Sequence, residues 1–339
     1  ATATISDANT TAIDATALSA IGGKTSGAVT VTNAIAISGT QAEITAALVT
    51  TDTLVVAATA TATISDANTT AIDATALSAI GGKTSGAVTV TNAIAISGTQ
   101  AEITAALVTT DTLVVAATAT VTSSDAMSVA EANAVDAKTS GVITATLDTG
   151  DTASYSTLTG TGNAYTVTVN DAGSTAITAT ALSTLGGKTT GTVTVSNAIA
   201  ISGTQAEVTA ALVTTDTLVV AGSATATISD ANTTAIDATA LSAIGGKTSG
   251  AVTVTNAIAI SGTQAEITAA LVTTDTLVVA GTATATISDA NTTAIDATAL
   301  SAIGGKTSGA VTVTNAIAIS GTQAEITAAL VTTDTLVVA

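Results

Sequence analysis

The chain contains no cysteine, histidine, arginine, phenylalanine or tryptophan among its 339 residues. Catalysis by a thiolate or an imidazole is therefore excluded, and so is a metal cage of cysteine and histidine ligands. Carboxylates are the only realistic candidates left for acid–base chemistry. Aromatic residues make up 1% of the chain, too few for the stacking platform of a carbohydrate site. We expect a protein that is not an enzyme.

Positive charge is also scarce. The chain has six lysines against 24 acidic residues, so its net charge is −18. Such a chain is repelled by nucleic acid and by anionic lipid, so we expect neither as a partner. The mean hydropathy is +0.62, yet polar residues interrupt every apolar run well before the ~18 residues of a membrane span. The chain opens at Ala1 without a visible signal peptide, which indicates a segment of a longer protein.

A repeat dominates what is present. Equivalent aspartates recur at an even spacing, apart from one shorter interval between the third and the fourth, at Asp7, Asp66, Asp125, Asp171, Asp230 and Asp289. They define repeats 1–59, 60–118, 119–164, 165–223, 224–282 and 283–339. Repeats one, two, five and six are identical from ATATISDANTT to DTLVVA, and the third is divergent and shortened. Identical repeats cannot each hold a different active site, so one repetitive domain is expected over 1–339.

Within a repeat, short stretches with alternating hydrophobicity predict strands, as in 28–32 and 53–57. Matching Ile5 to Ile37 and then to Ile64 predicts two unequal coils per repeat, 5–36 and 37–63. The predicted fold is all-β, a parallel β-solenoid with two coils per repeat and short helical turns on one edge. An α/β solenoid similar to leucine-rich repeats is the alternative.

The helical turns carry recognisable starting signals. Thr40 with Glu43, and Ser128 with Glu131, have the spacing of a capping box, and Asp14 precedes a third helical segment as an N-cap residue.

A second interpretation of the acidic positions is a calcium site. Aspartate and asparagine two positions apart, with a further aspartate beyond, supply the oxygen ligands that Ca²⁺ prefers. The candidates are Asp7, Asn9, Asp14, Asp66, Asn68, Asp73, Asp230, Asn232, Asp237, Asp289, Asn291 and Asp296. Aspartates at turns and helix caps explain the same pattern without a metal. No cofactor is expected, apart from this calcium.

Two further patterns have a functional and a structural interpretation. Thr-x-Thr stretches such as 2–4 and 30–32 could present a flat ice-binding face. The divergent repeat holds both tyrosines, Tyr155 and Tyr165, and is either the place of a unique contact or a degenerate coil with a hairpin across 161–163.

The succession of SDA, GKTSG, VTV and ISGT segments resembles the repeats of very large, acidic, Thr- and Ala-rich secreted proteins of marine cyanobacteria and other marine bacteria. Some of those are cell-surface proteins linked to swimming motility, and others are adhesin-like or calcium-dependent. The resemblance implies a structural or adhesive repeat at the cell surface and supplies no catalytic residue.

The expected function is therefore that of an extracellular structural or adhesive module, a segment of a long surface fibre. The alternatives are a calcium-stabilised adhesin spacer, an ice-binding β-solenoid and, last, a carbohydrate-active β-helix enzyme. Ala339 corresponds to Ala57 and Ala1 to Ala60, so a second segment would continue the repeat without the equivalents of 58 and 59. The expected partner is another copy bound end to end, or further repeats of the same chain.

Overall fold

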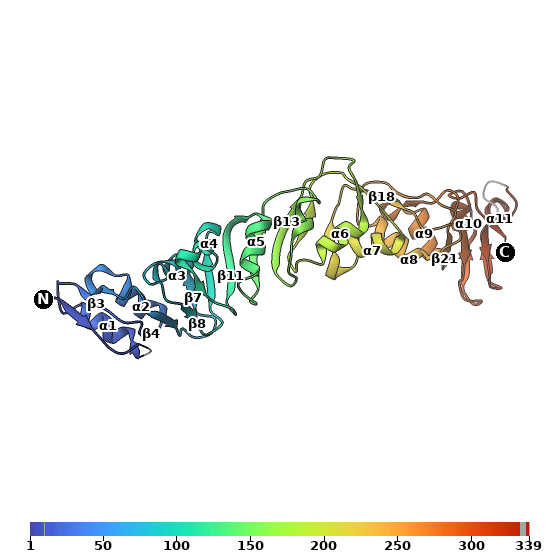
Figure 1. Ribbon diagram of the computed structural model, residues 1–339. Helices are drawn as coiled ribbons and strands as arrows, with labels where there is room; N and C mark the ends of the chain where they lie inside the picture. The colour runs from blue at the N-terminus through green and yellow to red at the C-terminus, as the bar shows by residue number, and fades with distance from the viewer. Residues whose placement is uncertain (10, 333–336, 339) are drawn as a thin grey trace. The chain divides into compact units, whose positions relative to one another are not determined.

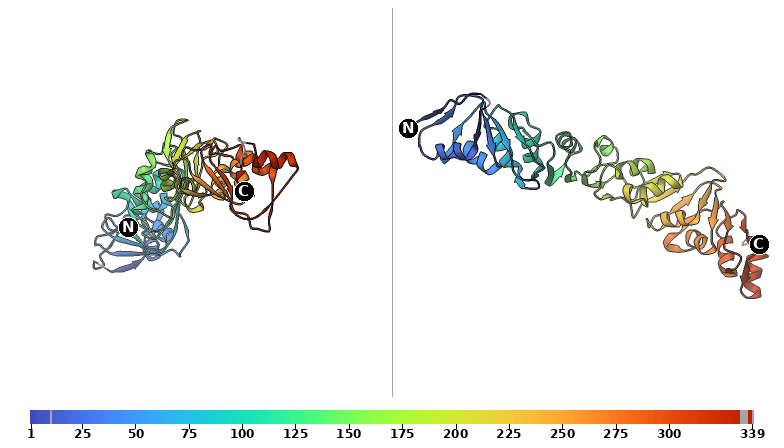
Figure 2. Two further views of the ribbon diagram at one scale, coloured as in Figure 1. Left: turned by 90° about the vertical axis from the view of Figure 1, so that its right-hand side faces the viewer. Right: turned by 90° about the horizontal axis from the view of Figure 1, so that it is seen from below.

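The computed structural model describes residues 1–9, 11–332 and 337–338. The chain forms two compact units, residues 1–148 with 157–167 and residues 149–156 with 168–339. Strands and helices alternate within each unit (Figures 1 and 2). Eleven α-helices, each of eight residues, and 27 strands lie in the described part of the chain.

The first unit contains the elements up to the divergent repeat. Its strands are β1 (Ala3–Ile5), β2 (Ala12–Asp14), β3 (Val29–Val31), β4 (Ala36–Gly39), β5 (Val55–Val56), β6 (Thr61–Ile64), β7 (Ala71–Asp73), β8 (Val88–Val90), β9 (Ala95–Gly98), β10 (Val114–Val115), β11 (Thr120–Met127) and β12 (Ile143–Leu147). Its helices are α1 (Ala15–Gly22), α2 (Gln41–Leu48), α3 (Ala74–Gly81), α4 (Gln100–Leu107) and α5 (Val129–Asp136). Strand β13 (Ala164–Val169) runs from the first unit into the second.

The second unit follows the same pattern. Its strands are β14 (Ala176–Thr178), β15 (Val193–Val195), β16 (Ala200–Gly203), β17 (Val219–Val220), β18 (Thr225–Ile228), β19 (Ala235–Asp237), β20 (Val252–Val254), β21 (Ala259–Gly262), β22 (Val278–Val279), β23 (Thr284–Ile287), β24 (Ala294–Asp296), β25 (Val311–Val313), β26 (Ala318–Ser320) and β27 (Val337–Val338). Its helices are α6 (Ala179–Gly186), α7 (Gln205–Leu212), α8 (Ala238–Gly245), α9 (Gln264–Leu271), α10 (Ala297–Gly304) and α11 (Gln323–Leu330).

The strands form parallel sheets in which neighbours are two places apart in chain order, except that β11, β12 and β13 are consecutive neighbours. The order is β2-β4-β6-β8-β10 in the first unit and β14-β16-β18-β20-β22 and β19-β21-β23-β25-β27 in the second. Helices pack about 8–10 Å apart and strands pair at about 4.8 Å. A stack with one helix per coil therefore cannot extend one ladder indefinitely, and these sheets each end after five strands.

The all-β prediction is wrong, because the protein is α/β. The expected helical turns are full helices of two turns, and their composition explains the difference. Segments such as Gln41–Leu48 contain Ala, Gln, Glu and Leu, which favour helix, and a capping box starts them. The capping boxes of Thr40 with Glu43 and of Ser128 with Glu131 are confirmed, as is the Asp14 cap of α1.

The predicted coil boundaries at Ile5, Ile37 and Ile64 are also wrong. Ala12 pairs with Ala36, and Ala36 pairs with Thr61, whereas the equivalent of Ala12 in the next repeat is Ala71, so one ladder does not return to the same position in successive repeats. Strand β2, which takes part in this pairing, is not among the strands that the sequence pattern predicts. Ile37 therefore lies beside Ile13 and Ala62, and Ile5 beside Val31.

The core is a stack of small and β-branched side chains on the inner face of each sheet. In the second unit it follows one row across five strands. That row is Ile236, Ile260, Ala285, Val311 and Val337, each at most 3% exposed. Leucines and isoleucines of the helices cover the row, and fully burying one such side chain contributes roughly 1.5–3 kcal/mol.

The divergent repeat keeps the parallel arrangement. Strands β12 and β13 pair in parallel, with Ala145 opposite Tyr165, so the expected hairpin across 161–163 is not formed. The segment between them, 148–163, contains the 3-10 helix Ser154–Thr157 and no α-helix.

Candidate functional site

The most repetitive polar feature is the loop after the Thr-rich strand. We call it the SDAN loop; it comprises Ser6–Asn9 and its equivalents. In repeat two, a carboxylate oxygen of Asp66 accepts a hydrogen bond from the backbone N–H of Gln41, 2.6 Å away, at the first residue of helix α2 in the preceding coil. Helix N-termini carry unpaired N–H groups and a partial positive charge, so a carboxylate stabilises them.

The same contact recurs along the chain. Aspartate accepts from the corresponding N–H at 2.6–2.7 Å in the pairs Asp125–Gln100, Asp230–Gln205 and Asp289–Gln264. Asp171 of the fourth repeat accepts from the backbone N–H of Thr152, in the divergent repeat, at 2.7 Å. The contact is therefore kept even where the helix is lost.

The SDAN loop also bonds to the following coil. The side-chain amide of Asn92 donates to the carbonyl oxygen of Asp66 at 2.7 Å, and the side-chain oxygen of Asn68 accepts from the N–H of Ala93 at 3.0 Å. Thr69 adopts a left-handed backbone with φ of 65°, and its N–H donates to the carbonyl of Ala93 at 2.7 Å. In repeats two and five the SDAN loop thus connects three consecutive coils.

The calcium candidates have separate partners in the structure. Asp14 accepts from the N–H of Thr16 in its own helix at 2.8 Å, and Asn9 accepts from the N–H of Ala34 in the next coil at 3.2 Å. The other helix caps, Asp73, Asp237 and Asp296, accept in the same way at 2.7–2.8 Å. Hydrogen bonds from Thr239 hold the pKa of Asp237 below its usual value. Within the described ranges, no three acidic side chains converge as a metal site would require.

We expect the melting temperature to be the same in a chelator and in millimolar calcium. The reason is that the side-chain oxygens of ten of the twelve candidates, Asp7 and Asn291 being the exceptions, already accept backbone hydrogen bonds, which a cation would have to displace. Thermal unfolding followed by circular dichroism measures this. A rise of several degrees with calcium, lost on replacing Asp66 with Asn, would show that the SDAN loop binds the ion.

A shallow cavity recurs beside each of the four identical repeats. Its volume is about 640–730 Å³. In repeat two it is lined by the Gly-Gly-Lys-Thr-Ser-Gly-Ala segment 81–87 together with Thr110, Asp111 and Val115. The segment is fixed to the preceding coil, because the hydroxyl of Ser85 donates to the carbonyl of Ala58 at 3.0 Å.

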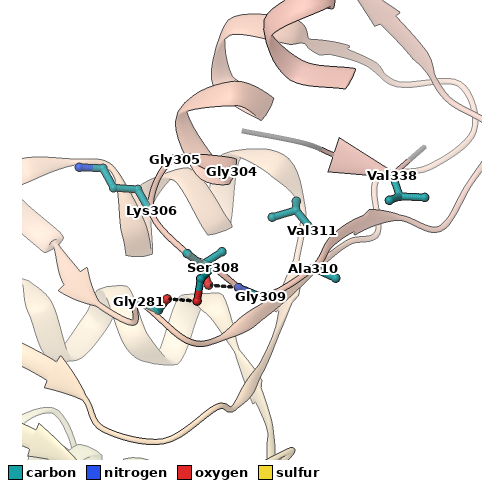
Figure 3. Close-up of a pocket in the computed structure, with 10 residues that line it drawn as sticks. Gly281, Gly304, Gly305, Lys306, Ser308, Gly309, Ala310, Val311 and Val338 are labelled. Carbon is teal, nitrogen blue, oxygen red and sulfur yellow. Dashed lines mark hydrogen bonds between the residues drawn. The ribbon is translucent and has the colours of Figure 1, made fainter. Parts of the chain in front are cut away.

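Figure 3 shows the equivalent cavity of the last repeat. Ser308 donates to the carbonyl of Gly281 at 3.0 Å, and the hydroxyl of Thr307 donates to the carbonyl of Ala283. The side chain of Lys306 extends away from Gly309. Both hydroxyls are thus engaged within the protein, and Lys306 is the only charged side chain among the described residues that line this cavity.

The outer face of the sheets tests the ice-binding interpretation. The outward row of the second unit is Asp237, Ser261, Thr286, Thr312 and Val338. Threonine therefore faces threonine across only two adjacent strands before valine or serine interrupts it. In this row the threonines therefore form one pair and not the continuous threonine surface that the ice-binding interpretation would need.

Both tyrosines are buried, Tyr155 within the divergent repeat and Tyr165 at the start of the next. In the second unit, Tyr155 is 3% exposed, and its hydroxyl donates to the carbonyl of Thr168 at 2.8 Å. It lines a small cavity of about 370 Å³ with Leu185 and Lys188. In the first unit, the buried side chain of Asn163 donates to Asp136 at 2.6 Å and accepts from the N–H of Ile143 at 2.8 Å. These contacts hold the shortened coil in place.

Burial, and second the negative charge of Asp136, raise the pKa of Tyr165 well above its ordinary value of 10.0. The neutral phenol is thus favoured in the folded state, so its contribution to stability is complete below pH 10 and is lost as the pH rises beyond it. We expect the first unit to unfold in alkali as Tyr165 ionises. Tyrosinate absorbance of a Tyr155→Phe variant measures this, and titration at the ordinary pKa in a folded chain would contradict it.

Sequence reasoning missed the bond between Asp66 and Gln41. A signal was present in the sequence. In four places the SDAN aspartate follows the glutamine of a Thr-Gln helix start by 25 positions.

No helix in the described part of the chain is long and apolar enough to span a bilayer.

A comparison of this chain with models of protein families, with curated proteins and with solved structures finds no match.

Proposed function

We propose that this protein is a structural repeat module of an extracellular or cell-surface fibre, in which the repeats act as a spacer or adhesive stalk. The observation that carries the proposal is the use of the SDAN loop. Its aspartate and asparagine side chains bond to the coils before and after it in repeats two and five. The most regular polar chemistry of the sequence thus serves cohesion between coils.

The charge and the core composition support the same role. A net charge of −18 keeps copies soluble and repels anionic surfaces. Small side chains pack in the same way between any two identical coils, so the number of repeats can increase without a change in the core residues.

Immunogold labelling of intact source cells, with antibodies raised against this chain, tests the proposal. We expect label on the outer surface of unpermeabilised cells, at positions along extended material. A cytoplasmic protein serves as the matched control for cell integrity. Label that appears only after permeabilisation would overturn the proposed location and role.

A further inference from the structure

A cavity of a different kind lies beside helix α6, within the second unit. Its volume is about 370 Å³, near the lower end of the range for small-molecule sites. Every described residue that lines it belongs to the second unit. Tyr155 and Leu185, which are 3% and 5% exposed, form an apolar wall. Lys188 is the only charged side chain among the lining residues that the structure describes.

The space for this cavity comes from a shortened helix in the preceding coil. Asp151 caps that helix, because its carboxylate accepts from the backbone N–H of Ser154 at 2.8 Å. The helix is the 3-10 helix Ser154–Thr157, whereas the coil before α8 supplies the eight-residue helix α7, which packs on α8. The shorter helix beside α6 leaves a volume that Tyr155 fills only in part.

Helix α6 and its cap differ from their copies only at residues that line this cavity. The copies are α1, α3, α8 and α10, each with its capping aspartate. Thr178 replaces that aspartate, Thr184 replaces an alanine and Leu185 replaces an isoleucine. Thr178 still caps the helix, since its side-chain oxygen accepts from the N–H of Ala181 at 3.2 Å. The exchange at 178 therefore keeps the cap and removes a negative charge from the cavity.

Lys188 differs from the other lysines in its burial. Its side chain is half-buried, whereas the lysines at the equivalent positions of the other repeats are exposed, namely Lys24, Lys83, Lys138, Lys247 and Lys306. Among the described residues, no carboxylate forms an ion pair with Lys188. A partly buried ammonium group without such a partner is unfavourable, and an anion bound in the cavity would offset that cost.

The neighbouring hydroxyls restrict the remaining chemistry of the cavity. The hydroxyl of Thr152 donates to Asp171 at 2.6 Å, and that of Thr180 donates to Glu207 at 3.0 Å. These hydroxyls are already engaged, and the two carboxylates that accept from them repel an ion with more than one negative charge. The cavity therefore suits a small apolar molecule that carries a single negative charge.

We propose that this cavity binds a monocarboxylic acid with a short hydrocarbon chain. The carboxylate accepts from the ammonium group of Lys188 and supplies the ion pair that this lysine lacks. The hydrocarbon chain lies against Tyr155 and Leu185 and removes their apolar surface from water. This site lies outside the proposed structural role and does not depend on it.

Isothermal titration calorimetry of the whole chain with octanoate tests the site. We expect one octanoate to bind per chain. Octan-1-ol has the same hydrocarbon chain without the charge and should bind about tenfold more weakly. Suberate, with a carboxylate at each end, should also bind more weakly than octanoate. Equal affinity for octanoate and octan-1-ol would overturn the role of Lys188, and no binding of octanoate would overturn the site.

Two variants and a matched control locate the ligand. Lys188→Met should weaken octanoate binding about tenfold, because it removes the charged donor and keeps a long side chain. Lys247→Met lies in the same Gly-Gly-Lys-Thr segment of an identical repeat and should change nothing. Thr178→Asp restores the residue of the copies, which caps α8 at 2.7 Å through Asp237, and its charge should weaken binding severalfold.

Circular dichroism checks that each variant is folded. Octanoate binding that is insensitive to both Lys188→Met and Thr178→Asp, or that Lys247→Met weakens equally, would place the ligand elsewhere and overturn the proposal. The surface-labelling result is independent of these outcomes, so the two proposals can fail separately.

Discussion

Replacing Gly81 with alanine should destabilise the first unit by about 3 kcal/mol, the upper part of the range for overpacked cores. Gly81 is the last residue of helix α3, and a methyl group there would lie 2.1 Å from the carbonyl oxygen of Thr112 in the next coil. The obstacle is backbone rather than a flexible side chain. The two coils can relieve the clash only by separating, which weakens the strand pairs and buried contacts between them.

The adjacent residue supplies the control. A methyl group on Gly82 would lie 3.5 Å from its nearest neighbour, an ordinary contact, and its φ of −71° suits alanine. We expect Gly82→Ala to be neutral or to stabilise the unit by about 0.5 kcal/mol, through the lower entropy of the unfolded chain. Urea unfolding, followed by the fluorescence of Tyr165 in a Tyr155→Phe background, measures both variants. Equal midpoints for Gly81→Ala and Gly82→Ala would contradict the close approach of the coils.

The second large effect is expected at Ile80. Ile80→Ala should cost about 2–5 kcal/mol, because it removes buried methyl groups and leaves a cavity under helix α3. The side chain is fully buried, although nothing in its local sequence differs from that of Ile21.

Ile21→Ala is therefore a matched control, because Ile21 occupies the same position in helix α1, which has the same sequence as α3. Because Ile21 is 42% exposed, we expect a loss of no more than about 1 kcal/mol under conditions in which the chain is monomeric. Urea unfolding of the two variants gives the difference. Similar losses would show that propensity within the helix, and not its position in the stack, determines the contribution of this isoleucine.

The identical repeats explain why some features followed from the sequence and others did not. The capping boxes at Thr40 and Ser128 and the Asp14 cap depend on residues a few positions apart, so local chemistry determined them. That these segments form full α-helices and not single turns could not be predicted from the sequence, because a short segment rich in alanine is compatible with a turn or a helix until it is packed.

Register was decided only by the tertiary structure. The segment Ala12–Asp14 is too short for periodicity to identify, and it became a strand because β4 offers it a free edge. The bond from Gln41 to Asp66 likewise joins residues 25 positions apart, and its geometry depends on how two coils stack.

The sequence by itself determined that this protein is a repetitive, acidic chain without thiol or imidazole chemistry, since composition and periodicity need no folding to be read. Only the tertiary structure decided that it is α/β, and which copy of an identical side chain is buried. Ile21 and Ile80 share one local sequence, so their difference in burial comes entirely from whether another coil lies against them.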